Sequence, residues 1–368
     1  EPLQIEHEHL IHFNPHLYGV DGSREASGSS MSYFCAVALD SANKNLADLA
    51  IVGAVGDRQD SSGKLLGLNE QILKEGKEAN ILKAEKDLRL FGRHTHPLHL
   101  ALSYTLEPYI PEITGNESKC VQFLTDLKIL SPDKWNRRLV DLNQDEKQRL
   151  ITSLILKMIE GGSPAEFAEG IIGEVYTLLK EDENSELRDA KSYAALLNAC
   201  GRSNNPSIGL ALCLGDRTDV VTEAKKILKN YRTKLSKSLD WLYQNLKSLV
   251  KLQYVQYFHA QNHIEEKLVG TITSMAMSSK ILDSDKPTIL FAFTNDGKIK
   301  VSARTTRGLV NKGVNLAEAL HNAAHAVGGE GGGHDIASGA TIPIGLENQF
   351  IKIVDETIKN QMSKSGSE

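Results

Sequence analysis

A glycine-rich stretch near the carboxyl end limits what this chain can fold into more than any other feature. Six of the twelve residues from 328 to 339 are glycine, a density that lets backbone approach a neighbour or a ligand without a Cβ in the way. A helix pattern precedes the stretch: Asn315 and Glu318 have capping-box spacing, and apolar residues run to Val327. A short strand pattern, residues 340–344, follows it.

The stretch favours binding of a phosphate or a nucleic-acid backbone over a flexible linker. Successive backbone N–H groups in such a turn form a concavity that binds anions. A linker would be polar and structureless on both sides, whereas here a helix and a strand enclose the glycines. The residues that we expect to contact phosphate are Gly331, Gly332, Gly333, His334, Ser338 and Gly339.

Composition sets the broad class of the chain. It has 368 residues, 40% hydrophobic and 24% charged, which suffices for two or three globular domains. No apolar run approaches about 18 residues, so no membrane span is predicted. A net charge of −5 argues against a surface that is basic throughout, but it allows a local basic groove. The four cysteines form no C-x-x-C pair, which predicts reduced thiols in a cytoplasmic protein.

Residues 1–113 are predicted to form an α/β domain. The run 47–55 is almost continuously apolar and ends at Gly56-Asp57, a pattern typical of a strand buried in a parallel sheet. Ligands bind beyond the carboxyl ends of such strands, so Asp57 has the position of a catalytic or metal-binding carboxylate. The position also suits an aspartate that caps a helix N-terminus, and spacing alone does not choose between the two.

Histidines cluster at residues 92–99. His94, His96 and His99 have spacings that could ligate a metal, but no cysteine or carboxylate lies among them. We therefore favour phosphate contact by Arg93 and His94, since guanidinium and imidazole both donate hydrogen bonds to phosphate oxygens.

Residues 114–188 are predicted to be a helical insertion. Residues 139–159 carry apolar side chains at helical spacing, a Gly-Gly-Ser-Pro break follows, and a further helix is predicted over 165–180. The acidic balance of this part argues against nucleic acid as its partner. Two interpretations stay open, a structural appendage or a docking surface for another protein.

The chain is then expected to return to the first domain over residues 189–221. A helix is predicted at 192–201 and a buried strand at 208–214. Asn198 and Arg202 stand just before that strand, where a loop is well placed to hold a phosphate. A surface ion pair is the commoner role of an arginine, and this alternative stays open for Arg202.

Residues 222–251 are predicted to form one long helix that connects two domains. Seven apolar residues from Leu228 to Leu249 recur every three or four positions and give it an apolar seam. Lysine and arginine dominate its outer face, which favours contact with nucleic acid. A short coiled-coil dimer and an ordinary solvated face are the alternatives.

Residues 252–362 are predicted to form a smaller mixed α/β domain, with residues 363–368 as a tail. The strand patterns 288–294 and 298–304 are joined by an Asn-Asp-Gly turn typical of hairpins. Arg304 ends the second strand near the glycine-rich stretch, where a guanidinium would complement bound phosphate.

Three motifs carry a resemblance to one family. Gly331-Gly332-Gly333-His334 with Ala337-Ser338-Gly339 resembles the GGGHxxAxG signature of the DHH-associated domain. Residues 198–202, Asn-Ala-Cys-Gly-Arg, resemble the NAxGR motif of RecJ-type proteins, and residues 53–57, Gly-Ala-Val-Gly-Asp, resemble the fourth motif of DHH phosphoesterases. The chain looks most like the archaeal RecJ-like nucleases that associate with the GINS replication complex.

This resemblance implies the architecture and the site. The fold would be α/β: a parallel-sheet DHH-type domain truncated at its N-terminus, a helical insertion, a long connecting helix and a DHH-associated domain. Asp57 would bind a divalent metal, and His334 would be a second catalytic residue. The NAxGR motif favours substrate contact by Asn198 and Arg202. The DHH triplet and two further acidic motifs would lie upstream of Glu1.

The activity implied is that of a single-strand-specific exonuclease acting on DNA or RNA in replication or repair. Two divalent ions, Mn²⁺ or Mg²⁺, would activate water and stabilise the leaving oxygen. Because most of their ligands would lie upstream, we expect these 368 residues to bind single strands weakly without cleaving them. In the family, an insertion such as 114–188 contacts replication proteins, including GINS.

Two other functions stay open. One is a replication scaffold that has lost catalysis, like the eukaryotic helicase subunit of the superfamily; retention of Asp57 and the intact glycine motif favour the nuclease instead. The other is a phosphodiesterase of short oligonucleotides or cyclic dinucleotides, against which the long basic helix favours a polymer substrate.

Overall fold

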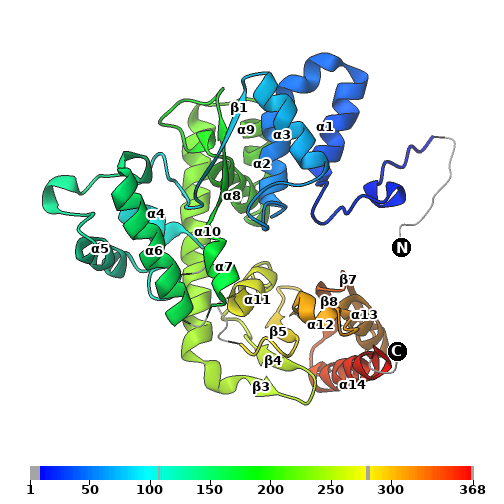
Figure 1. The fold of residues 1–368 in the computed structure, drawn as a ribbon. Coiled ribbons are helices and arrows are strands. Elements are labelled where there is room, and N and C mark those ends of the chain that lie inside the picture. The colour runs from blue at the N-terminus through cyan, green and yellow to red at the C-terminus, as the bar shows by residue number, and fades with distance from the viewer. Residues whose placement is uncertain (1–8, 107, 109, 162, 279–281, 366–368) are drawn as a thin grey trace. The chain divides into compact units, whose positions relative to one another are not determined.

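The structure is a computed structural model, and it describes residues 9–106, 108, 110–161, 163–278 and 282–365. The chain divides into two units, Glu1–Tyr231 and Arg232–Glu368. Helix α10 (Asp219–Gln244) begins in the first unit and ends in the second, which confirms the long helix expected there (Figure 1). None of the described helices is long and apolar enough to cross a membrane.

The first unit is mainly helical. Its α-helices are α1 (Gly28–Leu39), α2 (Ala47–Gly56), α3 (Leu68–Glu78), α4 (Leu98–Tyr104), α5 (Glu117–Asp126), α6 (Gln144–Glu160), α7 (Ala165–Glu169), α8 (Ala190–Arg202) and α9 (Pro206–Cys213). Its 3-10 helices are η1 (Pro15–Tyr18), η2 (Ser41–Leu46), η3 (Pro132–Lys134), η4 (Leu139–Asp141) and η5 (Glu186–Arg188). Strands β1 (Leu82–Leu88) and β2 (Ile172–Leu178) pair antiparallel, with Leu82 opposite Leu178.

Two runs predicted as buried strands are helices. Residues 47–55 lie in α2, where seven of the ten residues are buried because α1, α3 and α8 all pack against it. Residues 208–214 lie largely in α9. A helix that is apolar on every side shows no helical period, so such a run resembles a buried strand. Among the described strands of this unit none pairs in parallel.

One hydrophobic cluster of the first unit joins residues of the predicted insertion to residues that precede it. The cluster runs from Leu88 to Ile171 in sequence and includes apolar residues of α4, α5 and α6. The helix predicted over 165–180 is wrong beyond α7, because Gly170 ends that helix and the following residues pair with β1. The predicted insertion limits, 114–188, stay a prediction.

The second unit is a six-stranded sheet with helices. Its strands are β3 (Val250–Lys251), β4 (Gln256–His259), β5 (Thr288–Phe293), β6 (Lys298–Arg304), β7 (Glu330–Gly333) and β8 (Ala337–Pro343), in the order β3-β4-β5-β6-β8-β7. Only β4 and β5 pair in parallel among the described strands. The helices are η6 (Leu246–Ser248), α11 (Val269–Ser278), α12 (Arg307–Val310), α13 (Leu316–Ala326) and α14 (Glu347–Ser365). The fold class, mixed α/β, is confirmed.

Short-range sequence patterns predicted the helices and strands of this unit well. The predicted hairpin is β5–β6, and its turn contains Gly297 at φ +76°. Asn315 caps α13 by accepting a hydrogen bond from the N–H of Glu318 at 3.1 Å. The Glu318 carboxylate does not complete a capping box; it accepts from Gln361 Nε2 at 2.9 Å. The glycines after α13 form the edge strand β7 instead of an open loop.

Candidate nucleic-acid interface

Asp57 lies at the carboxyl end of α2 and its side chain is exposed. It therefore follows a helix, where the sequence predicted a strand or a helix N-cap. Its backbone N–H donates to Gly53 O at 2.9 Å. Its carboxylate oxygen Oδ2 accepts a hydrogen bond from Gln59 Nε2 at 3.1 Å.

A chain of buried polar side chains leads to this carboxylate. Gln59 Oε1 accepts from Asn69 Nδ2 at 2.5 Å, Asn69 Oδ1 accepts from the Ser30 hydroxyl, and the Ser30 and Ser27 hydroxyls are 2.6 Å apart. All four residues are at most 2% exposed. Because buried polar groups are costly unless bonded, this chain ties α1, α3 and the end of α2 to one geometry around Asp57.

Asn198 and Arg202 share one face of α8, four residues apart. The Asn198 amide donates to Gly56 O at 3.3 Å, which places it beside Asp57. One turn later, Arg202 Nη1 donates to the Tyr231 hydroxyl at 3.2 Å. Both side chains are exposed. The structure thus brings Asp57 and the two polar residues of the NAxGR motif to the same part of the first unit.

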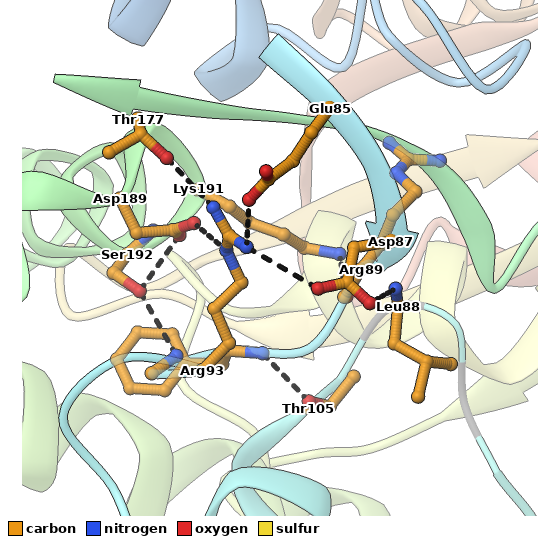
Figure 2. A network of polar contacts seen from close by, with 12 residues as sticks. Glu85, Asp87, Leu88, Arg89, Arg93, Thr105, Thr177, Asp189, Lys191 and Ser192 are labelled. Carbon is orange, nitrogen blue, oxygen red and sulfur yellow. Dashed lines mark hydrogen bonds and ion pairs between the residues drawn. The ribbon is translucent and has the colours of Figure 1, made fainter. Parts of the chain in front are cut away.

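Arg93 has a different environment, at the centre of a buried polar network (Figure 2). Its guanidinium is 1% exposed; Nε donates to Asp189 Oδ2 at 3.0 Å, Nη2 to Thr177 Oγ1 at 2.8 Å and Nη1 to Glu85 Oε1 at 3.3 Å. Asp87 Oδ2 is 3.6 Å from Nη1. Because the guanidinium donates its hydrogen bonds to other side chains of the protein, these contacts favour a structural role. Substrate contact by Arg93 stays a prediction without support from this geometry.

The network also fixes the start of α8. Asp189 is the N-cap of that helix and accepts from the N–H of Ser192 at 2.9 Å. Asn198 lies nine residues further on, about 14 Å along the axis at 1.5 Å per residue. Arg93 and the Asn198–Gly56 hydrogen bond therefore belong to opposite ends of α8. Hydrogen bonds from Lys83 and then Arg93 lower the pKa of Glu85.

The neighbouring histidines do not converge on one point. His94 Nε2 is buried without a hydrogen-bond partner, and burial, with the Arg93 charge, lowers the His94 pKa. His96 lies 3.9 Å from Glu186, and His99 packs against Trp135 with ring centroids 4.8 Å apart. Among the residues that the structure describes, no three His, Cys, Asp or Glu side chains are arranged to hold a metal ion. Asp57 alone does not make a complete site for Mn²⁺ or Mg²⁺, so no catalytic step through a metal follows from these residues.

In the second unit, most of the predicted residues meet at one end of the sheet. Arg304 ends β6 and pairs with Ala337 at the start of β8, while Gly333 at the end of β7 pairs with Ser338. His334 follows directly and is exposed. Arg304 is held there by hydrogen bonds from Nε to Ser274 Oγ at 2.9 Å and from Nη1 to Ser302 Oγ at 3.1 Å.

The three glycines of β7 have different surroundings. A Cβ on Gly331 would lie 2.7 Å from Leu320 O, so Gly331 permits close packing of the strand on α13. Gly333 has φ +146°, a backbone conformation that side-chain-bearing residues rarely adopt. Gly332 is exposed and a Cβ there would have nothing within 4 Å. Ser338 is buried and its hydroxyl donates to Gly332 O at 2.8 Å, so the phosphate contact predicted for this side chain has no support from this geometry. Gly339 lies opposite Gly332.

Sequence reasoning missed the residues that support the candidate site residues within each unit. Gln59 positions Asp57, while Ser274 and Ser302 hold Arg304. None of them belongs to a recognisable motif. Only the nearness of Gln59 to Asp57 in sequence gave any signal.

Comparison with known proteins identifies the family. The DHH-CID domain model matches residues 90–172, and the DHHA1 domain model matches residues 253–360. An uncharacterized protein of Methanocaldococcus jannaschii, MJ0831, is 34% identical over 357 residues, which cover 97% of this chain and 73% of that protein. The chain belongs to the DHH superfamily.

The chain also resembles solved structures. CDC45 from Entamoeba histolytica shares its fold, matching 91% of this chain and 69% of its own length, with a TM-score of 0.56 at 10% identity. RecJ from Thermus thermophilus, solved with Mg²⁺, matches 86% of this chain and 35% of its own, with a TM-score of 0.43 at 16% identity.

Proposed function

We propose that this chain holds the nucleic acid in a RecJ-like, single-strand-specific exonuclease that hydrolyses phosphodiester bonds in replication or repair, in the cytoplasm. The observation that carries the proposal is the exposed backbone of Gly332 on the edge strand β7, with His334 exposed directly after that strand and Arg304 at the same end of the sheet. The buried Ser338 hydroxyl supports the strand from within by donating to Gly332 O. A guanidinium, an imidazole and a backbone without side chains together suit a sugar-phosphate strand.

Each residue has a proposed part in holding the strand. Arg304 supplies positive charge that its two serine partners keep in place. Gly332 lets a phosphate approach the strand edge closely. His334, exposed at the end of β7, donates to a phosphate oxygen.

The first unit is proposed to contribute one metal ligand, Asp57, with Asn198 and Arg202 contacting substrate beside it. Mn²⁺ or Mg²⁺, when bound in the intact protein, would supply water activation and charge stabilisation. Because Asp57 is a single carboxylate, further ligands would have to come from outside the described residues. These 368 residues are therefore expected to bind single strands weakly and to leave them intact.

The test is binding and hydrolysis measured on the same preparations. Fluorescence anisotropy with labelled single-stranded DNA, single-stranded RNA and duplex is compared for the wild type, Arg304→Ala and His334→Ala. Lys352→Ala, which removes an exposed charge on α14, is the matched control. Single strands should bind best, and the two site variants should weaken binding where the control does not.

Hydrolysis is followed with Mn²⁺ on end-labelled strands of several lengths and on a cyclic dinucleotide. Cleavage by the 368 residues alone would contradict the expectation that metal ligands from outside the described residues are needed for hydrolysis. Where the gene encodes residues upstream, the longer protein should degrade single strands from one end, and Asp57→Asn should abolish this. A preference for dinucleotides over long strands would replace the exonuclease by a small-substrate phosphodiesterase.

A replication scaffold is the second candidate. The fold shared with CDC45 and the exposed apolar side chains of Leu156 and Phe167 on the insertion favour it. GINS or another replisome protein is the proposed partner of that surface. A longer protein that contains all the metal ligands, binds DNA and shows no turnover with Mn²⁺ would support the scaffold over the nuclease.

A further inference from the structure

We propose that His321 and His325 on α13 form a base-stacking subsite that extends the nucleic-acid surface along β7. This rests on the proposed function of the glycine strand and adds a kind of contact that the phosphate-binding residues lack. Both imidazoles are exposed, although the helix that carries them is otherwise anchored by buried apolar residues.

The two rings belong to the same surface as the open glycine strand. Helix α13 packs directly on β7, and Gly331 allows the close approach. His321 Nδ1 lies 3.2 Å from Gly331 O. Since a carbonyl oxygen only accepts, the proton of the ring is on Nδ1. One histidine is thereby fixed in orientation next to Gly332, where the backbone is open.

The geometry of the pair suits a planar base. The rings are four residues apart on the helix, their centroids are 6.5 Å apart and their planes differ by 29°. This separation is about twice the roughly 3.4 Å spacing of stacked bases. Aromatic faces bind the bases of single strands with little sequence preference, which matches a surface that otherwise recognises only backbone.

A metal site is the competing use of a histidine pair with this spacing. A third ligand is needed for a stable site, and the described part of the chain contains no group of three. Glu318, one turn before His321, accepts a hydrogen bond from Gln361. Base stacking therefore explains the arrangement of the two imidazole rings better than metal binding does.

The experiment separates base contact from phosphate contact. Fluorescein-labelled dT12 and an abasic strand of the same length and charge are titrated with the wild-type chain, His321→Ala/His325→Ala, and Asn322→Ala as an exposed control on the same helix. The double variant should bind dT12 roughly tenfold more weakly and the abasic strand as well as the wild type does. Arg304→Ala should weaken both strands.

Further variants distinguish stacking from the alternatives. His321→Phe/His325→Phe keeps the aromatic faces and should restore dT12 binding without either imidazole nitrogen. Equal loss on both strands, loss of wild-type dT12 binding on adding EDTA, or no restoration by phenylalanine would each overturn the stacking subsite. Unchanged binding by the alanine double variant would overturn it while leaving the glycine-strand function intact. Failure of the wild type to bind any single strand would overturn both.

Discussion

The buried amide of Gln59 donates a hydrogen bond to the exposed carboxylate of Asp57, from Nε2 to Oδ2 at 3.1 Å. Its Oε1 is committed to Asn69 at 2.5 Å, and its Nε2 also donates to Gly22 O at 3.0 Å. The amide therefore has a defined direction, with its donor end toward Asp57. The buried Gln59 side chain therefore fixes the orientation of the exposed Asp57 carboxylate.

Replacing Gln59 by leucine should destabilise the chain by about 1–3 kcal/mol, because Asn69 Nδ2 and Gly22 O lose a partner in the interior. Urea unfolding gives the free energy difference. The control is Asp57→Asn, which changes only the exposed end of the chain of hydrogen bonds and should stay within about 0.5 kcal/mol of the wild type. Equal stability of the two variants would show that the buried hydrogen bonds of Gln59 do not stabilise the fold.

Arg93→Met should destabilise the first unit by about 3–5 kcal/mol, since it leaves the buried Asp189 carboxylate without its cation. The exposed pair Lys74–Glu78 of the same unit offers the control, where Lys74→Met should cost about 0–1 kcal/mol. Thermal or urea unfolding measures both. Affinity of the folded Arg93→Met protein for single strands should equal that of the wild type. A loss of affinity with unchanged stability would instead support the substrate contact predicted from the sequence.

The difference between Arg93 and His334 shows what the sequence could reveal. His334 lies in a contiguous glycine motif whose own backbone would form the proposed binding surface, so the sequence alone is enough to predict where that surface lies. The partners of Arg93 include Thr177 and Asp189, which are 84 and 96 residues away in sequence. Nothing in the pattern around Arg93 indicates that three carboxylates surround it in the fold.

The same reasoning applies to the fold. Asn315 and the β5–β6 turn act through neighbours a few residues away, and both were placed correctly. Helix α2 was mistaken for a strand because burial against three other helices removes the polar face that reveals a helical period. Residues 172–178 form a strand because β1 pairs with them, and that pairing depends on residues far away in sequence.

Glu146 should make the insertion sensitive to acid. Arg137 donates two hydrogen bonds to its carboxylate, at 2.7 and 2.6 Å, and these lower the pKa of Glu146 to about 2. With the folded pKa below the unfolded value, Glu146 contributes stability above pH about 4.3. That contribution is lost as the pH falls toward 2.

Urea midpoints between pH 2 and 6 test this contribution. Glu146→Gln and Arg137→Gln should both lower stability at pH 6 and flatten its decline at low pH. Thr152→Ala, an exposed and non-titrating change on the same helix, should leave the curve as it is. An acid limb that is as steep in Glu146→Gln as in the wild type would assign the acid sensitivity to other carboxylates.

The glycines of β7 should separate folding from binding. Gly331→Ala places a methyl group 2.7 Å from Leu320 O and should cost about 1–3 kcal/mol of stability. Gly332→Val meets nothing within 4 Å at its Cβ, and valine favours strands, so stability should be kept. If a phosphate approaches the strand at Gly332, the branched side chain blocks it and affinity for single-stranded DNA should fall roughly tenfold, the loss of about one charge-assisted hydrogen bond. Anisotropy and urea unfolding on the same preparations measure the two effects. A stable Gly332→Val protein with full affinity would mean that the ligand does not contact this strand, even if Arg304 and His334 still bind it.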